Sequence, residues 1–272
     1  MKIVSYNING IRASNRLGLI DWIAETNYDI YCFQEIRANE DIARSIFLDN
    51  EQISLLDEKE SENLESLKKY FKFYNCGSIP GYAGTMVLSK IKPDKIEYGL
   101  GEHWEDQEGR VITTYFKNLA IVNAYIPNGN SRLEFKMKFL DALTKYLGIL
   151  RNKYSVICVG DFNIANDEID LTNPKECKNK SVFLPIEREA FKKILAQGYI
   201  DTFRQLYPDK REYSWRSYRS RQVNLPSTNY NSWKYRIDYA IMSNRHNFKL
   251  IDCEMPDLIY SDHLPVICTI ED

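Results

Sequence analysis

The sequence is poor in histidine and has no cysteine spacing of the kind that binds zinc. Only three histidines occur in 272 residues, at positions 103, 246 and 263, which excludes a metal site built mainly from imidazoles. The six cysteines form no C-x-x-C pair, and four lie in apolar segments where cysteine behaves as a small hydrophobe. We therefore expect neither a zinc site nor disulfides, whereas oxygen ligands for Mg²⁺ or Mn²⁺ remain possible.

The chain also lacks a long hydrophobic run and a linker rich in proline, glycine and serine. A helix needs about twenty apolar residues to span a bilayer, and no run approaches that length. The strand expected at 2–6 leaves no space for a signal peptide. We expect a single domain over residues 1–272, without contact with a membrane. Its expected location is the cytoplasm, associated with the nucleoid if the source is a prokaryote.

The net charge of -2 argues against a general polyanion binder, but the charges are unevenly distributed. Residues 49–66 are acidic, which predicts a solvated helix or loop that repels phosphate. Residues 204–236 interleave aromatic side chains with Arg204, Lys210, Arg211, Arg216, Arg219, Arg221, Lys234 and Arg236. This pattern is typical of a surface that follows a phosphate backbone. The alternative is a basic loop over core aromatics, and Trp215 in particular is expected in the core.

Hydrophobic periodicity predicts alternating strands and helices in two similar halves. In the first half, strands are expected at 2–6 and 29–33 around a helix at 16–26, followed by strands at 71–76, 85–88, 95–98, 110–116 and 119–124. A helix at 131–150 precedes the second half, with strands at 155–159, 236–242, 249–253 and 266–270 and a helix at 186–196. These elements predict a four-layered α/β sandwich, with two mixed sheets face to face and helices outside.

Polar side chains follow several of the predicted strands. They are Asn7, Glu35, Tyr125, Asn128, Asp161, Asn163, Asp238 and the pair Asp262-His263. Each alone is most often a turn residue, but so many clustered at one rim would be costly without a shared cation or ligand. Carboxylate and amide oxygens hold a hard cation that polarises phosphate, while a base orients water. The set predicts phosphodiester hydrolysis, with Asp238 as a candidate partner for His263.

Short strings along nearly the whole chain carry a family resemblance. They are SYNINGIR (5–12), FQE (33–35), QEGRV (107–111), NAYIPN (123–128), GDFN (160–163), EIDL (168–171), NPK (173–175), FLP (183–185), RIDY (236–239) and SDH (261–263). In this order they resemble the exonuclease III family of abasic-site endonucleases, within the endonuclease/exonuclease/phosphatase superfamily. The resemblance implies a deoxyribonuclease I-like sandwich and Mg²⁺-dependent hydrolysis of the phosphodiester 5′ to an abasic site in duplex DNA. It also implies 3′-repair phosphodiesterase and 3′ to 5′ exonuclease activity.

The resemblance further implies roles for the rim residues. Asp161 would orient or deprotonate the attacking water, and Asn163 would hold a phosphate oxygen. Tyr125 would contact the scissile phosphate, which His263, oriented by Asp238, would bind and neutralise. The sequence leaves open whether Asp161 or His263 takes the proton of the water.

A metal site at the same rim is implied as well. Glu35 would be the principal ligand, helped by Asn7 and Asp262. The cation would be Mg²⁺, with Mn²⁺ as a substitute. Further possible ligands are Asp161, Asn163 and His263.

DNA contacts are the third implication, with a monomer that binds double-stranded DNA carrying abasic sites or blocked 3′ ends. The candidate residues are Asn9, Arg12, Arg37, Tyr82, Arg110, Asn128, Asn173, Asn179, Trp233 and Tyr235. The chain departs from the family pattern at three places. The segment 218–238 is longer than in the family, and Tyr235 stands where the family has tryptophan. Residues 128–132 offer no clear counterpart of the basic residue that some relatives insert into DNA. Cys177 and Lys180 replace amides that are common in the family.

Two other functions fit parts of the sequence. The superfamily chemistry could act on small phosphoesters, although the basic and aromatic segment 204–236 disfavours this. A DNA-binding module with a decayed site is the non-enzymatic alternative, but none of the expected ligands is missing. The sequence therefore favours a DNA repair nuclease.

Overall fold

Two mixed six-stranded sheets pack face to face in the structure, a computed structural model that describes residues 1–47, 58–217, 233–244 and 247–271. The first sheet has the order β13 (Lys249–Glu254), β14 (Val266–Glu271), β1 (Lys2–Asn7), β2 (Ile30–Gln34), β4 (Thr85–Ser89) and β3 (Phe71–Asn75). The second has the order β5 (Lys95–Tyr98), β6 (Val111–Phe116), β7 (Leu119–Tyr125), β8 (Ser155–Asp161), β12 (Asp238–Ser243) and β9 (Tyr199–Asp201). A short pair, β10 (Trp215–Arg216) and β11 (Lys234–Tyr235), lies beside them.

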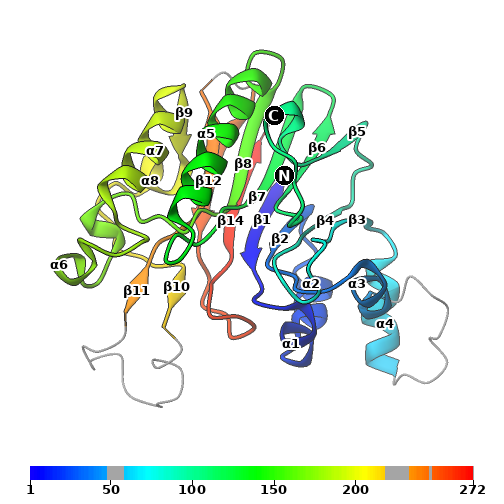
Figure 1. Cartoon of the computed structure of the whole chain (residues 1–272). Coiled ribbons are helices and arrows are strands. Elements are labelled where there is room, and N and C mark those ends of the chain that lie inside the picture. The colour runs from blue at the N-terminus through cyan, green and yellow to red at the C-terminus, as the bar shows by residue number, and fades with distance from the viewer. Residues whose placement is uncertain (48–57, 218–232, 245–246, 272) are drawn as a thin grey trace.

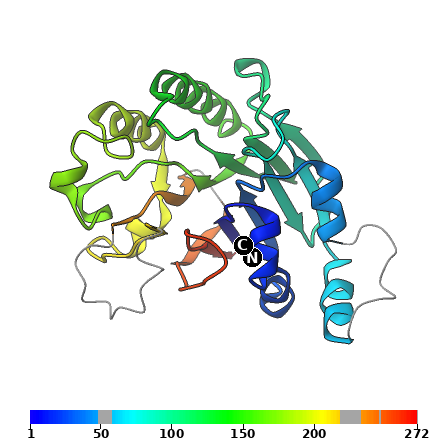
Figure 2. The same ribbon diagram turned by 60° about the horizontal axis from the view of Figure 1, so that its bottom comes forward.

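Helices cover the outer faces of both sheets (Figures 1 and 2). The helices of the described residues are α1 (Ile11–Arg16), α2 (Leu19–Thr26), α3 (Glu40–Ile46), α4 (Glu58–Leu67), α5 (Leu133–Leu150), α6 (Pro174–Cys177), α7 (Pro185–Ala196) and α8 (Thr202–Leu206). Helix α8 lies at the edge of the sandwich instead, where Phe203 enters the core between the sheets. In Figure 2, α5 and α7 lie outside one sheet and α1 and α2 outside the other. Within the described ranges, no helix is long and apolar enough to cross a membrane.

The strands alternate between two apolar environments. In β1, Ile3 belongs to the core between the sheets, whereas Val4 and Tyr6 pack in the core beneath α2. In β7, Ile121 faces the other sheet and Val122 packs beneath α5. Because side chains alternate along a strand, both faces of each sheet are buried. The predicted four-layered sandwich is confirmed.

The pairing of the strands brings their polar ends to one rim. Strand β1 runs parallel to β2, with Asn7 opposite Gln34, so the next residue, Glu35, lies beside Asn7. In the other sheet Asp161 pairs with Tyr125 on one side and with Asp238 on the other.

A buried amide pair ties the two sheets together just behind this rim. The Gln34 side chain donates to Asn123 Oδ1 at 2.7 Å, and the Asn123 amide donates to the backbone oxygens of Phe33 and Met86, each at 3.0 Å. Gln34 and Asn123 are fully buried and belong to different sheets. Hydrogen bonds of this kind require a defined geometry. They therefore fix the position of one sheet relative to the other.

The prediction of the N-terminal helices was correct in part. The helix expected at 16–26 is present as α2 but begins only at Leu19, because Gly18 has a φ of 102° that a right-handed helix cannot contain, and α1, which precedes it, was not predicted. Helix α3 was not predicted, because its seven residues are too few for a clear periodicity. Its N-terminus is capped by Asn39, whose side chain accepts from the Ile42 N–H. Of the acidic region, 58–66 lies in α4 and the preceding residues lie outside the described ranges.

Two arginines expected to follow a phosphate backbone instead stabilise the fold. Arg236 is 1 % exposed and binds Asp170 at 2.8 Å and Asp201 at 2.7 Å, while Arg204 also binds Asp170, at the same oxygen Oδ1. Burial acts to raise the pKa of Asp170, but the two guanidinium groups outweigh it and hold this pKa below its ordinary value. Much of the remaining basic segment, 218–232, lies outside the described residues.

A buried ion pair joins α5 to α7. Lys136 Nζ lies 2.7 Å from Glu187 Oε1, and both side chains are fully buried. The same ammonium donates to the backbone oxygen of Asn163, and Glu187 accepts from Ser181 and from the Val182 N–H. Burial lowers the pKa of Lys136, and Glu187 opposes this effect. The pair therefore links two helices to the loops at the rim.

We predict that Lys136→Met lowers the free energy of unfolding by about 3–5 kcal/mol, because it leaves Glu187 buried without its cation. Lys138→Met is the matched control on the same helix, since Lys138 is 67 % exposed and its pair with Glu134 is solvated. The control should change stability by less than about 0.5 kcal/mol. Urea unfolding followed by circular dichroism measures both. Equal effects of the two substitutions would contradict a structural role for the buried pair.

Candidate active site

Three rim residues that follow strand ends have a left-handed backbone conformation. The φ angles are 47° for Asn9, 57° for Glu35 and 51° for Asn163. Non-glycine residues adopt this region infrequently, at a cost of roughly 1–3 kcal/mol, and such residues cluster at functional sites. Gly160, just before Asp161, is needed for another reason: a Cβ there would lie 1.8 Å from the Ala124 backbone oxygen.

The Asn7 amide connects the acidic groups of the two sheets. Its Nδ2 donates to Glu35 Oε2 and to Asp161 Oδ2, each at 2.9 Å. Its Oδ1 accepts from the Asn9 N–H at 3.0 Å, which fixes the amide orientation. Glu35 is also paired with Arg37 through its other oxygen. Asn7 thus holds two carboxylates that would otherwise repel each other.

Asp161 is buried, and the hydrogen bonds that it accepts stabilise its ionised form only in part. It accepts from the Asn163 backbone N–H at 2.8 Å and from the Asn163 side chain at 3.1 Å. Burial, followed by the nearby charge of Asp238, raises the pKa of Asp161 to about 7, although His263 acts in the opposite direction. A carboxylate with such a pKa can accept a proton near neutral pH.

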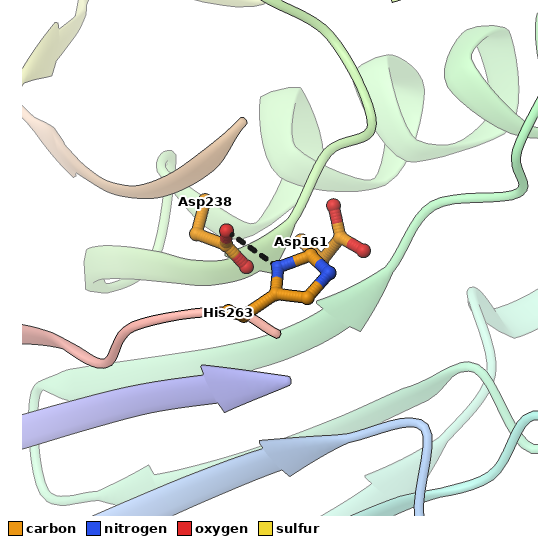
Figure 3. Close-up of side chains that lie close together, drawn as sticks. All are labelled: Asp161, Asp238 and His263. Carbon is orange, nitrogen blue, oxygen red and sulfur yellow. Dashed lines mark hydrogen bonds and ion pairs between the residues drawn. The ribbon is translucent and has the colours of Figure 1, made fainter. Parts of the chain in front are cut away.

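His263 lies between Asp161 and Asp238 (Figure 3). Its Nδ1 is 2.8 Å from Asp238 Oδ2, and both residues are buried. Burial alone would lower the pKa of His263, but Asp238 and then Asp161 raise it to about 10. Asp238 is itself held by the Ser214 hydroxyl, which accepts from its backbone N–H. A pKa raised in this direction favours the imidazolium form of the ring at neutral pH.

A cavity of about 650 Å³ opens over these groups. The predicted site residues that line it are Asn9, Glu35, Arg37, Tyr82, Arg110, Tyr125, Asn128, Asp161, Asn163, Tyr235, Asp262 and His263. Asn7 and Asp238 stand behind the wall, where they contact Asp161 and His263. The structure thus brings together every residue predicted for catalysis and metal binding.

Four predicted DNA-binding residues do not line this cavity. Arg12 is exposed on α1, Asn173 precedes α6, and Asn179 is exposed beyond it. Trp233 contacts Tyr235 edge-on at 6.2 Å and lies under the Lys180 ammonium. Contact of these four residues with DNA stays a prediction.

Arg110 supports the site from within the protein. It is 2 % exposed, donates to the Tyr125 backbone oxygen at 3.0 Å and stacks on the Tyr125 ring. Burial, and then the charges of Glu35 and Asp161, raise the pKa of the Tyr125 hydroxyl well above its ordinary value. Tyr125 therefore remains a hydrogen-bond donor toward the cavity.

Eight residues of the cavity wall were not predicted as site residues, and two of them, Trp215 and Arg132, make polar contacts with other residues of the wall or with their partners. Trp215, expected in the core, is half-buried and lines the cavity, because its hairpin strand β10 pairs with the segment around His263. Arg132 lines it as well, paired with Glu108 at 2.8 Å and donating to the Tyr82 hydroxyl. In the QEGRV string, Glu108 lies two residues before Arg110. This carboxylate was a signal that a second arginine, Arg132, could pair with it. No sequence signal separated Trp215 from the surrounding aromatic residues.

The donor set of the cavity fits a hard divalent cation. The carboxylates of Glu35, Asp161 and Asp262 face the same space, and Asp238 lies directly behind. Asp238 Oδ1 is buried and has no hydrogen-bond partner among the described residues. Oxygen ligands and an excess of negative charge suit Mg²⁺ or Mn²⁺ better than softer metals.

A four-layered α/β sandwich with carboxylates, amides and an Asp-His pair at one rim defines a phosphoesterase. The chain belongs to the endonuclease/exonuclease/phosphatase family, whose sequence profile matches residues 4–263.

Relatives within this family are nucleases. The chain is 37% identical to an exodeoxyribonuclease of Bacillus subtilis over 98% of each protein. It is 34% identical to the DNA repair nuclease APEX1 of Danio rerio, over 98% of this chain and 81% of that protein. Among solved structures, it resembles an AP endonuclease from Archaeoglobus fulgidus with a TM-score of 0.81, at 24% identity and complete coverage of both chains. The resemblance inferred from the sequence is confirmed.

We predict that Asp238→Asn lowers the pKa of His263, because the carboxylate that most strongly opposes the effect of burial is removed while Asp161 and Asp262 remain. Ring NMR shifts followed against pH in EDTA measure this. Since the folded pKa in the native protein exceeds the unfolded value of about 6.5, protonated His263 stabilises the fold fully below that pH. This contribution is lost as the pH rises towards 10, and the variant should show a weaker dependence.

Asp257→Asn is the control for this experiment, because Asp257 is 69 % exposed and pairs with Arg216. Its His263 should titrate as in the native protein. A pKa that stays near 10 in Asp238→Asn would contradict the assigned partnership.

Proposed function

We propose that the protein is a DNA repair nuclease that hydrolyses the phosphodiester on the 5′ side of abasic sites in double-stranded DNA, with Mg²⁺ as cofactor. The relatives named exodeoxyribonuclease and DNA repair nuclease support this assignment. The observation that carries it is Asp161, buried next to a protonated His263 in a cavity that also contains Glu35 and Asp262. Removal of 3′ blocking groups and 3′ to 5′ exonuclease activity would use the same site, since each hydrolyses a phosphoester.

In this proposal Asp161 is the general base. Its pKa of about 7 suits proton transfer from water at neutral pH, and Asn7 and Asn163 fix its orientation. His263 cannot accept that proton, because its imidazolium already carries one on each nitrogen. It would donate instead to a phosphate oxygen and neutralise charge that develops there. The Tyr125 hydroxyl would donate to the same phosphate group.

Glu35 and Asp262 would hold the cation, with Asn7 fixing Glu35 through its amide nitrogen. When bound, Mg²⁺ supplies Lewis-acid polarisation of a phosphate oxygen. Tyr235, Trp215 and Ile237 add apolar surface to the lining of the cavity. Such a surface suits a sugar that lacks a base, because it offers packing without hydrogen bonds to base edges.

We predict that the purified protein cuts a duplex with one abasic site when Mg²⁺ is present and leaves it intact in EDTA. A matched undamaged duplex should not be cut internally. Denaturing gels of labelled duplexes measure the position and amount of cleavage. Release of phosphate from inositol phosphates, with no cleavage of the abasic duplex, would instead select a small-molecule phosphoesterase.

We predict that Asp161→Asn lowers kcat by at least about a hundredfold and leaves binding of the abasic duplex nearly unchanged, because the lost base acts in the transition state. Single-turnover cleavage and fluorescence anisotropy in Ca²⁺ measure the two quantities. Asp141→Asn is the matched control, since Asp141 is 66 % exposed on α5 and pairs only with Lys145 in the described structure. Near-native turnover of Asp161→Asn would remove Asp161 from the role of base.

A further inference from the structure

The carboxylate of Asp262 is held at both oxygens. Its Oδ1 accepts from Asn9 Nδ2 at 2.8 Å, and its Oδ2 accepts from the Trp215 indole N–H at 3.1 Å. The plane of this carboxylate is therefore set by two different donors.

The position of the Trp215 indole is fixed by the backbone around it. The Arg216 N–H donates to the Asp262 backbone oxygen at 3.0 Å, and the Leu264 N–H donates to the Ser214 oxygen at 2.6 Å. These two bonds bracket the bridge between Trp215 and His263. The indole therefore keeps one place relative to the carboxylate.

The Trp215 ring is also part of the lining of the cavity. Trp215 stacks on Tyr235 with ring centroids 4.9 Å apart and an angle of 19° between the planes. Both rings line the cavity, as Asp262 does. The stack holds the indole plane, and with it the direction of the N–H, so that the bond to Asp262 is preorganised. Phenylalanine could replace the ring at this position but not the donor.

We propose that Trp215 is a positioning residue of the metal site, whose indole N–H orients Asp262 so that its carboxylate is ready to bind the cation. This inference rests on the proposed function only in that Asp262 holds a divalent cation. Removing a group that orients a metal ligand typically lowers the affinity for the metal by about 10- to 100-fold. The residue thus does more than form the cavity wall.

The test is the affinity of the DNA-free protein for Mn²⁺, measured by the EPR signal of the free ion. Trp215→Phe should weaken this affinity about tenfold or more. The Mg²⁺ concentration at half-maximal cleavage should rise by the same factor. An unchanged Mn²⁺ affinity would overturn the proposal.

Trp104→Phe is the matched control, because Trp104 is another half-buried tryptophan and contacts Phe135 and Phe139 away from the cavity. It should leave the Mn²⁺ affinity unchanged. Thermal unfolding of both variants separates a loss of metal affinity from a loss of folded protein.

A double-mutant cycle with Asp262→Asn isolates the interaction. If Trp215 acts through Asp262, Trp215→Phe should cause no further loss of Mn²⁺ affinity in the Asp262→Asn protein. Two independent losses that add would contradict the proposal. Since Mn²⁺ binding is measured without DNA, a failure to cut abasic duplexes would overturn the proposed function while leaving this result intact.

Discussion

The hydrogen bond between Gln34 and Asn123 is the contact on which the geometry of the site depends. It crosses the interface of two sheets whose shared core is mainly apolar, and apolar contacts alone are not directional and would not fix one sheet against the other. Gln34 immediately precedes Glu35, and Asn123 lies two residues before Tyr125. A shift between the sheets would therefore move Glu35 away from Tyr125 and Asp161. Because the amide pair is fully buried, such a shift would leave polar groups unpaired at a cost of about 1–3 kcal/mol each.

Once the sheets are fixed, the rim concentrates negative charge that the protein neutralises only in part. The Asn7 amide separates Glu35 from Asp161 without adding charge, and His263 contributes the positive charge closest to Asp161 and Asp238. The proton prefers His263 because Asp238 contacts it directly. Asp161 consequently remains an acceptor, although burial raises its pKa. The arrangement that makes these carboxylates costly to bury therefore also places a proton donor, His263, within a few ångströms of a proton acceptor, Asp161.

The sequence predicted the strands and the gathering of polar residues at one rim, because both follow from local rules. Apolar runs form buried strands, and polar residues directly after them must emerge at strand ends, as Glu35 and Asp161 do. Features that depend on distant partners were not predictable. Arg236 was expected at the surface because its partners, Asp170 and Asp201, are far from it in the chain. Trp215 was expected in the core because nothing local shows that Asp262 accepts its N–H.

The structure also changes the meaning of the basic and aromatic segment. Arg236 neutralises buried acids, and Trp215 and Tyr235 form a wall of the cavity. Two arginines of the cavity wall are themselves paired, Arg37 with Glu35 and Arg132 with Glu108. These two arginines are thus partly neutralised, in keeping with a net charge of -2. For the nuclease that we propose, recognition of DNA would therefore depend more on the shape and apolar lining of the cavity than on a general attraction for phosphate, because paired cations release fewer counterions on binding DNA.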